Sequence, residues 1–150
     1  MEQPIDSYKT IRKSSPEVLF KDRNSKFYGY AYPVNSESDI KKCLESTKKE
    51  HHSARHWCYA YQFGTKEDSI QFRANDDGEP SGSAGRPILG QLDSFGVTNT
   101  FVVVVRYFGG TKLGTGGLVR AYSDACNTVI QESELFPYVK LRKYVFTVGY

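Results

Sequence analysis

Of all segments of this chain, a glycine-rich one with basic residues at both ends has the composition most typical of a ligand-binding site. It reads RYFGGTKLGTGGLVR and joins a run of valines to a stretch with helical spacing. A helix that begins among glycines presents unpaired N–H groups and a positive dipole end, and anions bind there. The segment therefore predicts an anion- or nucleic-acid-binding edge made of Arg106, Gly109, Gly110, Lys112, Gly114, Gly116, Gly117 and Arg120. A strand-to-helix turn without a ligand fits the spacing equally well.

Two more specific nucleotide-binding motifs do not fit this segment. A Walker A loop requires a lysine directly after its second glycine, but Thr115 follows Gly114. A Rossmann domain requires a further strand–helix–strand unit and an acidic residue about 20 positions on. Too little chain remains for that unit, so we expect no cofactor.

Two other segments carry side chains that could bind a metal ion or take part in catalysis. The loop DDGEPSG contains Asp76, Asp77 and Glu79, which could bind a hard cation or share a proton. A solvated turn held by Asx hydrogen bonds is the more common outcome, so we treat the three as an acidic loop of unknown role. His56 and Cys58 share one face of an expected strand, but a metal site or a Cys–His nucleophile would need partners from elsewhere. We keep His56 as a possible accessory residue and predict no catalytic residue and no metal site.

Hydrophobic periodicity predicts the elements that position these segments. Strands are expected at residues 18–22, 26–34, 56–63, 69–73, 100–107 and 140–149. Helices are expected from a Ser36 cap to near His51, from near Pro87, and from the glycine-rich segment onward. The order indicates an α+β fold with its helices on one face of a sheet.

Aromatic residues alternate along two of the expected strands. Tyrosines occupy positions 28, 30 and 32, and Trp57 is followed by tyrosines at 59 and 61. Such stripes could stack single-stranded bases or offer a protein partner an exposed face. Core packing is the more common explanation for at least one stripe.

Bulk composition is that of one globular domain. The 150 residues are 39% hydrophobic and 25% charged, with a net charge of +3. The sequence pI of about 8.7 is below the value above 9 typical of dedicated nucleic-acid modules. No apolar run approaches the roughly 20 residues that span a bilayer, and the first residues lack the apolar core of a signal peptide. We therefore expect a cytoplasmic protein without a membrane partner.

Three blocks of the sequence resemble the YigZ/Impact N-terminal-domain family. They are HSARHWCYAY (His52–Tyr61), DDGEPSGSAGRPIL (Asp76–Leu89) and VVVVRYFGGTKLGTGGLVRAYSDA (Val102–Ala125). The resemblance implies a two-layer sandwich of the ribosomal-protein type, similar to domain IV of elongation factor G. It also implies an Impact N-terminal-like domain over residues 1–137. Residues 138–150 would then be the first strand of a truncated ferredoxin-like second domain, or a C-terminal extension.

The same resemblance implies a role in translation, because eukaryotic relatives are translational regulators. The leading hypothesis is a binding protein that meets RNA, the ribosome or a translation-control partner through the basic glycine-rich edge. One alternative is an enzyme acting on a phosphorylated or nucleotide substrate, with the acidic loop supplying a base or metal ligands. Another is a protein-interaction module that uses an exposed aromatic face. Binding is favoured over catalysis because no catalytic set assembles in the sequence.

Overall fold

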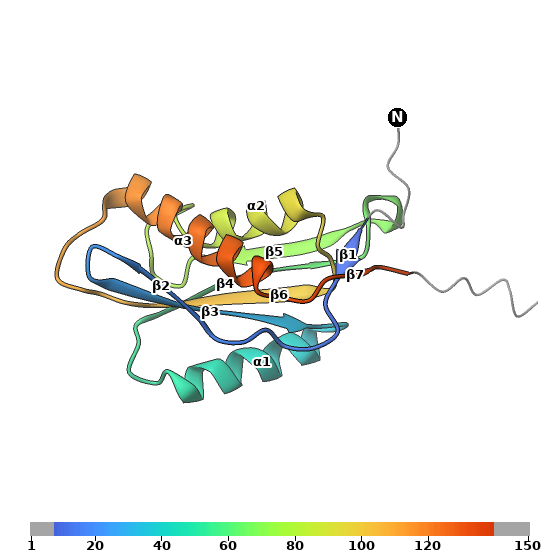
Figure 1. The fold of residues 1–150 in the computed structure, drawn as a ribbon, viewed down its shortest axis with the longest axis horizontal. Helices are drawn as coiled ribbons and strands as arrows, with labels where there is room; N and C mark the ends of the chain where they lie inside the picture. Colours follow the sequence, from blue (N-terminus) through green and yellow to red (C-terminus); the bar gives the residue numbers. More distant parts are fainter. Residues whose placement is uncertain (1–7, 140–150) are drawn as a thin grey trace, which may run out of the picture.

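A five-stranded antiparallel sheet lies at the centre of the protein (Figure 1). A computed structural model describes residues 8–139. The elements in chain order are β1 (Lys9–Thr10), β2 (Val18–Asp22), β3 (Ser25–Pro33), α1 (Glu37–Glu50), β4 (His56–Phe63), the 3-10 turn η2 (Lys66–Asp68), β5 (Gln71–Asn75), α2 (Gly85–Phe95), β6 (Thr100–Tyr107), α3 (Gly114–Gln131) and β7 (Phe136–Pro137). The strand order in the sheet is β2-β3-β6-β4-β5, and β1 pairs with β7 in a separate ribbon.

The central strand β6 is buried on both of its faces. Successive side chains of a strand point to opposite sides of the sheet. Val102 and Val104 accordingly join the core beneath α2 and α3, whereas Phe101, Val103 and Val105 join the core on the other side. All five are fully buried. This double burial explains why the FVVVV run is apolar throughout rather than alternating.

The predicted α+β class is confirmed, but the placement of every helix on one face of the sheet is wrong. Helices α2 and α3 cover one face and α1 covers the other, so the domain has three layers (Figure 1). The tyrosine stripes cause this difference. Tyr30 and Tyr61 are buried against α1, and Tyr32 shares a hydrogen bond of 2.8 Å with Thr47 of that helix. These aromatic side chains form a second core, which confirms the core-packing interpretation of the stripes.

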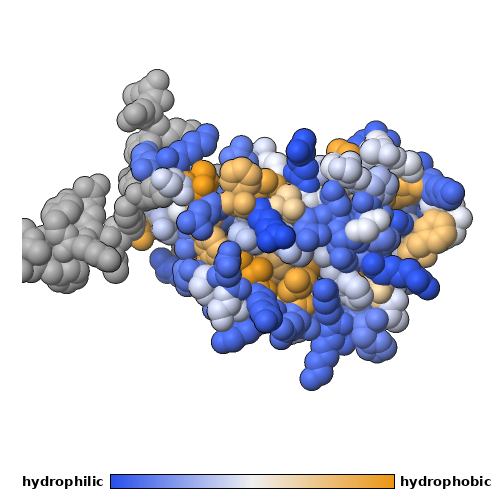
Figure 2. Space-filling model, turned by 180° about the vertical axis from the view of Figure 1, so that it is seen from behind, coloured by the Kyte–Doolittle hydropathy of each residue, from blue (hydrophilic) through white to orange (hydrophobic). Residues whose placement is uncertain are grey.

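Large hydrophobic side chains that remain exposed are distributed over different elements. They are Leu19, Phe72, Phe108 and Val139 among the described residues. On the face seen in Figure 2, hydrophilic residues cover most of the surface and hydrophobic ones show between them in small groups. The aromatic face on which the interaction-module hypothesis depended lies under α1.

The break expected between the strands at 18–22 and 26–34 and the cap expected at Ser36 are both confirmed. Arg23 and Asn24 form the turn between β2 and β3 with φ of 45° and 71°, and two positive φ values are typical of a type I′ hairpin. Ser36 caps α1, because its hydroxyl accepts a hydrogen bond of 3.2 Å from the backbone N–H of Asp39.

Other boundaries differ from the sequence predictions. Helix α2 begins at Gly85 rather than near Pro87, and β5 lies two residues later than expected. The short ribbon of β1 and β7 was not predicted, because two-residue strands carry no periodic signal. The strand predicted at 140–149 lies outside the described residues, and the domain boundary near residue 137 stays a prediction. No helix within residues 8–139 has the length and apolar character needed to cross a lipid bilayer.

Candidate functional site

Helix α3 begins inside the glycine-rich segment, and its first turn faces solvent. Leu113 is the N-cap residue, and no side chain of the described residues caps the helix there. The first four helical residues, 114–117, include no Asp or Glu, and Thr115 and Gly116 are exposed. The first N–H groups of a helix have no intrahelical partner and carry the positive end of its dipole. This end of α3 can therefore accept an anion.

The hairpin turn between β2 and β3 packs directly against the glycine-rich segment. A Cβ atom on Gly109 would lie only 2.0 Å from the carbonyl carbon of Asn24, so glycine is required at this close approach. The Gly109 N–H donates a hydrogen bond of 3.2 Å to the Ser25 hydroxyl. Arg23 Nη2 lies 3.1 Å from where a Cβ on Gly117 would be. The Arg23 guanidinium is thus placed at the first turn of α3.

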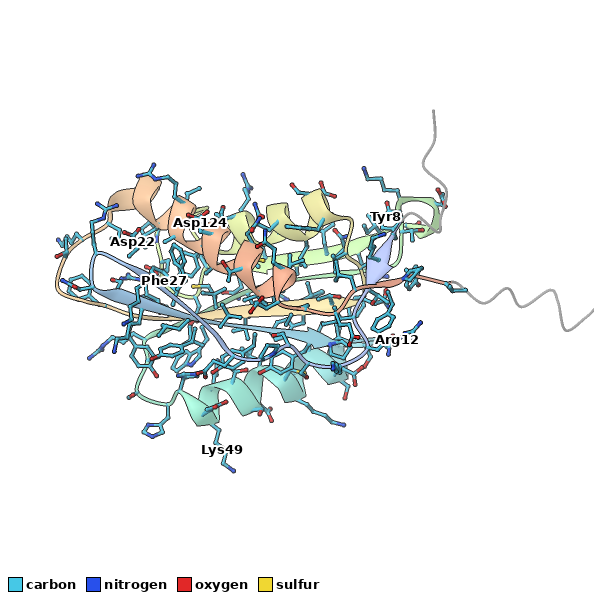
Figure 3. The ribbon with its side chains drawn as sticks, in the orientation of Figure 1. Tyr8, Arg12, Asp22, Phe27, Lys49 and Asp124 are labelled. Carbon is cyan, nitrogen blue, oxygen red and sulfur yellow. The ribbon has the colours of Figure 1, made fainter. Side chains whose placement is uncertain are left out.

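Three exposed basic residues lie at this end of α3. Arg23 comes from the β2–β3 turn, Lys112 from the loop before α3, and Arg120 from the second turn of the helix. Arg120 Nη1 lies 3.6 Å from where a Cβ on Gly116 would be. Asp22 is one acidic neighbour, with Oδ1 at 3.4 Å from Arg23 Nε, and Figure 3 shows it at the same end of the molecule. The exposed Asp124 is a second, four residues after Arg120 on α3. We call Arg23, Lys112, Arg120 and the first turn of α3 the basic glycine edge.

The N-terminus of α2 differs from that of α3, because a carboxylate of the protein itself, that of Asp76, binds its backbone N–H groups. Asp76 Oδ1 accepts from the backbone N–H groups of Ala84 at 3.1 Å and Gly85 at 2.8 Å, and Oδ2 accepts from that of Gly82 at 2.8 Å. Burial alone would raise the pKa of Asp76, but these three N–H donors outweigh it and lower that pKa. One helix start is therefore occupied by an anion of the chain itself.

Glu79, the third acidic residue of the loop, is buried in an ion pair with Arg106. The Glu79 side chain is 3% exposed and that of Arg106 is 11% exposed. Arg106 donates from Nε to Oε2 at 2.6 Å and from Nη2 to Oε1 at 2.9 Å. Burial would raise the pKa of Glu79, but the hydrogen bonds from Arg106 and Tyr122 lower it overall. A carboxylate held in this way is a weak base.

The ion pair belongs to a larger buried network that joins β4, β6 and α3. The Tyr122 hydroxyl donates to Glu79 Oε2 at 2.5 Å, and Cys58 Sγ lies 3.3 Å from that hydroxyl. His56 Nδ1 lies 2.8 Å from the backbone carbonyl oxygen of Asp77, and its Nε2 lies 3.8 Å from Glu79 Oε1. Burial raises the pKa of the Cys58 thiol well above its usual value, so this cysteine stays protonated.

The predicted site residues fall into two groups in space. Gly110, Gly114, Gly116, Lys112 and Arg120 are exposed. Gly109 is half-buried, Gly117 is buried, and Arg106 directs its guanidinium to the buried Glu79. Contact of Arg106 with a bound anion stays a prediction. Sequence reasoning missed Arg23, whose one signal was its place in the turn before Ser25. It also had no signal that Glu79 is buried, because a glutamate next to Pro80 in a polar loop is typically exposed.

Residues 23–130 match the family model of the Impact N-terminal domain. The chain belongs to this family. The predicted resemblance is thereby confirmed, and the match begins at Arg23 and ends in α3. It includes the basic glycine edge and the buried Glu79 network.

Impact-family relatives are longer than this chain. The IMPACT family member YigZ of Escherichia coli (strain K12) is 39% identical over 133 residues, which cover 89% of this chain and 65% of YigZ. A solved structure of a hypothetical protein matches with a TM-score of 0.80 and 37% identity, over 86% of this chain and 62% of that one. The structure of the two-domain translational regulator Yih1 matches with a TM-score of 0.51 and 25% identity, over 89% of this chain and 50% of Yih1. The chain thus spans between half and two thirds of these relatives.

Proposed function

We propose that this Impact-family chain is a translation-associated regulatory domain of the cytoplasm that binds RNA, free or in the ribosome, through the basic glycine edge. The regulatory part of the proposal is supported by its relative Yih1, which is described as a two-domain translational regulator. The chain spans half of Yih1, so a regulatory role like that of the whole Yih1 protein is assigned to this chain only as part of the proposal.

The open N-terminus of α3 is the observation that carries the proposal. Its first turn has neither a capping side chain among the described residues nor an acidic residue at positions 114–117. Arg23 and Arg120 reach its first turn, and the exposed Lys112 lies in the loop just before it. Phosphate groups bind well where backbone N–H donors and cationic side chains converge. The N-terminus of α2, which Asp76 occupies, shows that a carboxylate satisfies such a helix start in this fold.

The buried network favours a rigid binding surface. Glu79 links Arg106 at the end of β6 to Tyr122 of α3, and these two residues flank the glycine-rich segment on either side. Gly109 is fixed against the β2–β3 turn by the hydrogen bond to Ser25. A surface that is ordered before binding loses little conformational entropy when a ligand arrives.

The test is a binding titration of the full chain with fluorescein-labelled single-stranded RNA and with purified ribosomes at several salt concentrations. Three phosphate contacts to single-stranded RNA would make log K fall with log salt at a slope of about −2. The variant Lys112→Glu/Arg120→Glu should bind at least tenfold more weakly, and its salt slope should shrink by about 0.7 for each lost contact. The matched control is Lys41→Glu/Lys42→Glu, which makes the same charge change on exposed positions of α1, on the other face of the sheet.

The control variant should keep nearly all of the wild-type affinity. Equal losses in both double variants would mean that net charge alone drives binding, and the proposed site would be wrong. Binding that does not depend on salt would contradict it as well. No binding to either RNA or ribosomes at low salt would end the proposal.

A further inference from the structure

A hollow lined mainly by aromatic rings lies next to the basic glycine edge. Its volume is about 350 Å³, and its lining residues are Asn24, Lys26, Tyr28, Tyr107 and Phe108. They belong to the β2–β3 turn, the start of β3 and the end of β6, which Figure 1 shows at one end of the molecule. Ligand pockets in proteins typically measure about 300–1,000 Å³, so this hollow has room for one small ring system.

The two tyrosine rings of the hollow are fixed by their neighbours. Tyr28 and Tyr107 meet edge to face, with ring centroids 5.7 Å apart and ring planes at 86°. The Tyr107 hydroxyl lies 2.8 Å from Nδ1 of the buried His51, and the Tyr28 ring centroid lies 5.0 Å from that of the imidazole. Because both rings are held by the same imidazole, a ligand would meet a surface that is already formed.

Phe108 adds an exposed aromatic ring to the lining. The residue directly precedes Gly109 and is 59% exposed. Arg106 Cζ lies 5.9 Å from the centroid of the Phe108 ring, which is within the range of a cation–π contact. Arg106 is itself held by Glu79, so the Phe108 ring rests against a fixed group. An exposed ring supported in this way is suited to stacking with another flat ring.

Two exposed polar residues complete the lining. Lys26 lies opposite Tyr107 in the β3–β6 ladder, so their side chains are on the same face of the sheet. The Lys26 ammonium can donate to a base oxygen or to a phosphate, and the Asn24 amide offers both a donor and an acceptor. Proteins bind unpaired bases by stacking them on aromatic rings and by hydrogen bonds to the base edges. The hollow provides both kinds of group.

The hollow and the basic glycine edge share the β2–β3 turn. Arg23 reaches the first turn of α3, whereas the next residue, Asn24, lines the hollow. On the other side, Phe108 lines the hollow, and the next residue, Gly109, donates to the Ser25 hydroxyl at 3.2 Å. An RNA strand with a phosphate at the first turn of α3 would therefore have a neighbouring base beside the aromatic rings.

We propose that this hollow binds one unpaired base of single-stranded RNA by stacking it against Phe108 and the tyrosine rings. The inference rests on the proposed function, because the same RNA strand would place its phosphates on the basic glycine edge. A base inside a duplex is paired and stacked on its neighbours, so the hollow can act only on a single strand. Stacking tolerates any base because every base has a flat face, so we expect little dependence on sequence.

The test compares three labelled ligands by fluorescence anisotropy with the full chain. They are a single-stranded RNA of mixed sequence, a strand with the same number of phosphates but abasic sugars, and the RNA annealed to its complement. The wild type should bind the RNA strand about fivefold or more tightly than the abasic strand. Phe108→Ala should remove most of this difference and leave the affinities for the abasic strand and the duplex unchanged. Phe108→Tyr should restore the difference, because it retains the ring.

Phe72→Ala is the matched control, because Phe72 is 60% exposed on β5, at the opposite edge of the sheet from β2. It should bind all three ligands as the wild type does. Both phenylalanines are exposed, so neither substitution should disturb the fold, which circular dichroism checks. The salt slope of RNA binding should be the same in Phe108→Ala as in the wild type, because no phosphate contact is lost.

The outcomes separate this inference from the proposed function. Equal affinity of the wild type for the RNA and abasic strands, with the expected salt slope, would overturn the base site and leave the proposed function standing. An equal loss in Phe72→Ala, or a loss of abasic binding in Phe108→Ala, would also overturn the base site alone. No binding of either strand at low salt would overturn both.

Discussion

Replacing Glu79 with alanine should lower the free energy of unfolding by about 3–5 kcal/mol. The substitution leaves the Arg106 guanidinium, whose side chain is 11% exposed, without a counter-charge. It also removes the acceptor of the Tyr122 hydroxyl, which is buried in the same network. An unpaired buried polar group costs about 1–3 kcal/mol by itself, and an unpaired charge costs more. The magnitude therefore rests on burial rather than on the short distances of the ion pair.

Urea denaturation at pH 7 measures this loss, and a double-mutant cycle separates its causes. Arg106→Met alone should be strongly destabilising, whereas Glu79→Leu/Arg106→Met should lose less than the sum of its single changes. The exposed pair of Lys13 and Glu134 is the control, since its atoms are 3.3 Å apart with side chains 75% and 59% exposed. Glu134→Ala should cost less than about 1 kcal/mol. The reasoning is refuted if Glu79→Ala costs no more than this control, or if the two changes in the cycle are simply additive.

Three further predictions follow from described contacts. The lowered pKa values of Asp76 and Glu79 mean that their stabilising effect is complete above about pH 5 and is lost as the pH falls through their native pKa values. The urea midpoint should therefore fall as the pH is lowered from 7 to 2. In Glu79→Ala the midpoint should fall less steeply over the same range. Asp76→Ala should cost about 1–2 kcal/mol and speed amide hydrogen exchange at Gly85, because the start of α2 loses its cap; unchanged exchange there would contradict this. Gly29→Ala should cost about 1–3 kcal/mol, since its Cβ would lie 2.3 Å from Val129 Cγ2. A Val129→Ala background should recover part of that loss, and no recovery would place the cause elsewhere.

Local chemistry made much of the fold predictable from the sequence. The Ser36 cap, the turn before Ser25 and the valine run of β6 each depend on residues close together in the chain. The position of α1 could not be derived in this way. A strand with alternating tyrosines fits an exposed face as well as a buried one, because tyrosine has an apolar ring and a polar end. Tertiary contacts with α1, such as the hydrogen bond between Tyr32 and Thr47 and the burial of Tyr30 and Tyr61, decide between them.

In the candidate site, too, features made by contiguous residues were predictable, and features made by contacts between distant segments were not. The glycine-rich segment was recognisable because its glycines and basic residues are contiguous in the sequence. Arg23 joins it only because the hairpin turn packs against Gly109, and Asp76 caps a helix that starts nine residues later. Glu17 likewise lies near His51 although 34 positions separate the two in the sequence, with Oε2 at 3.6 Å from Nε2. Contacts between distant segments carry no periodic signal, and they account for most of what the sequence did not predict.

The central place of β6 in the sheet has a consequence during synthesis on the ribosome. Its neighbours β3 and β4 both precede it in the chain, so the β2–β3 and β4–β5 hairpins emerge before the strand that joins them. Until Thr100–Tyr107 leaves the exit tunnel, each hairpin has an unpaired inner edge, and unpaired strand edges are prone to aggregation. Nascent chains released before residue 107 should therefore depend on chaperones, whereas those that include β6 can close the sheet in one step.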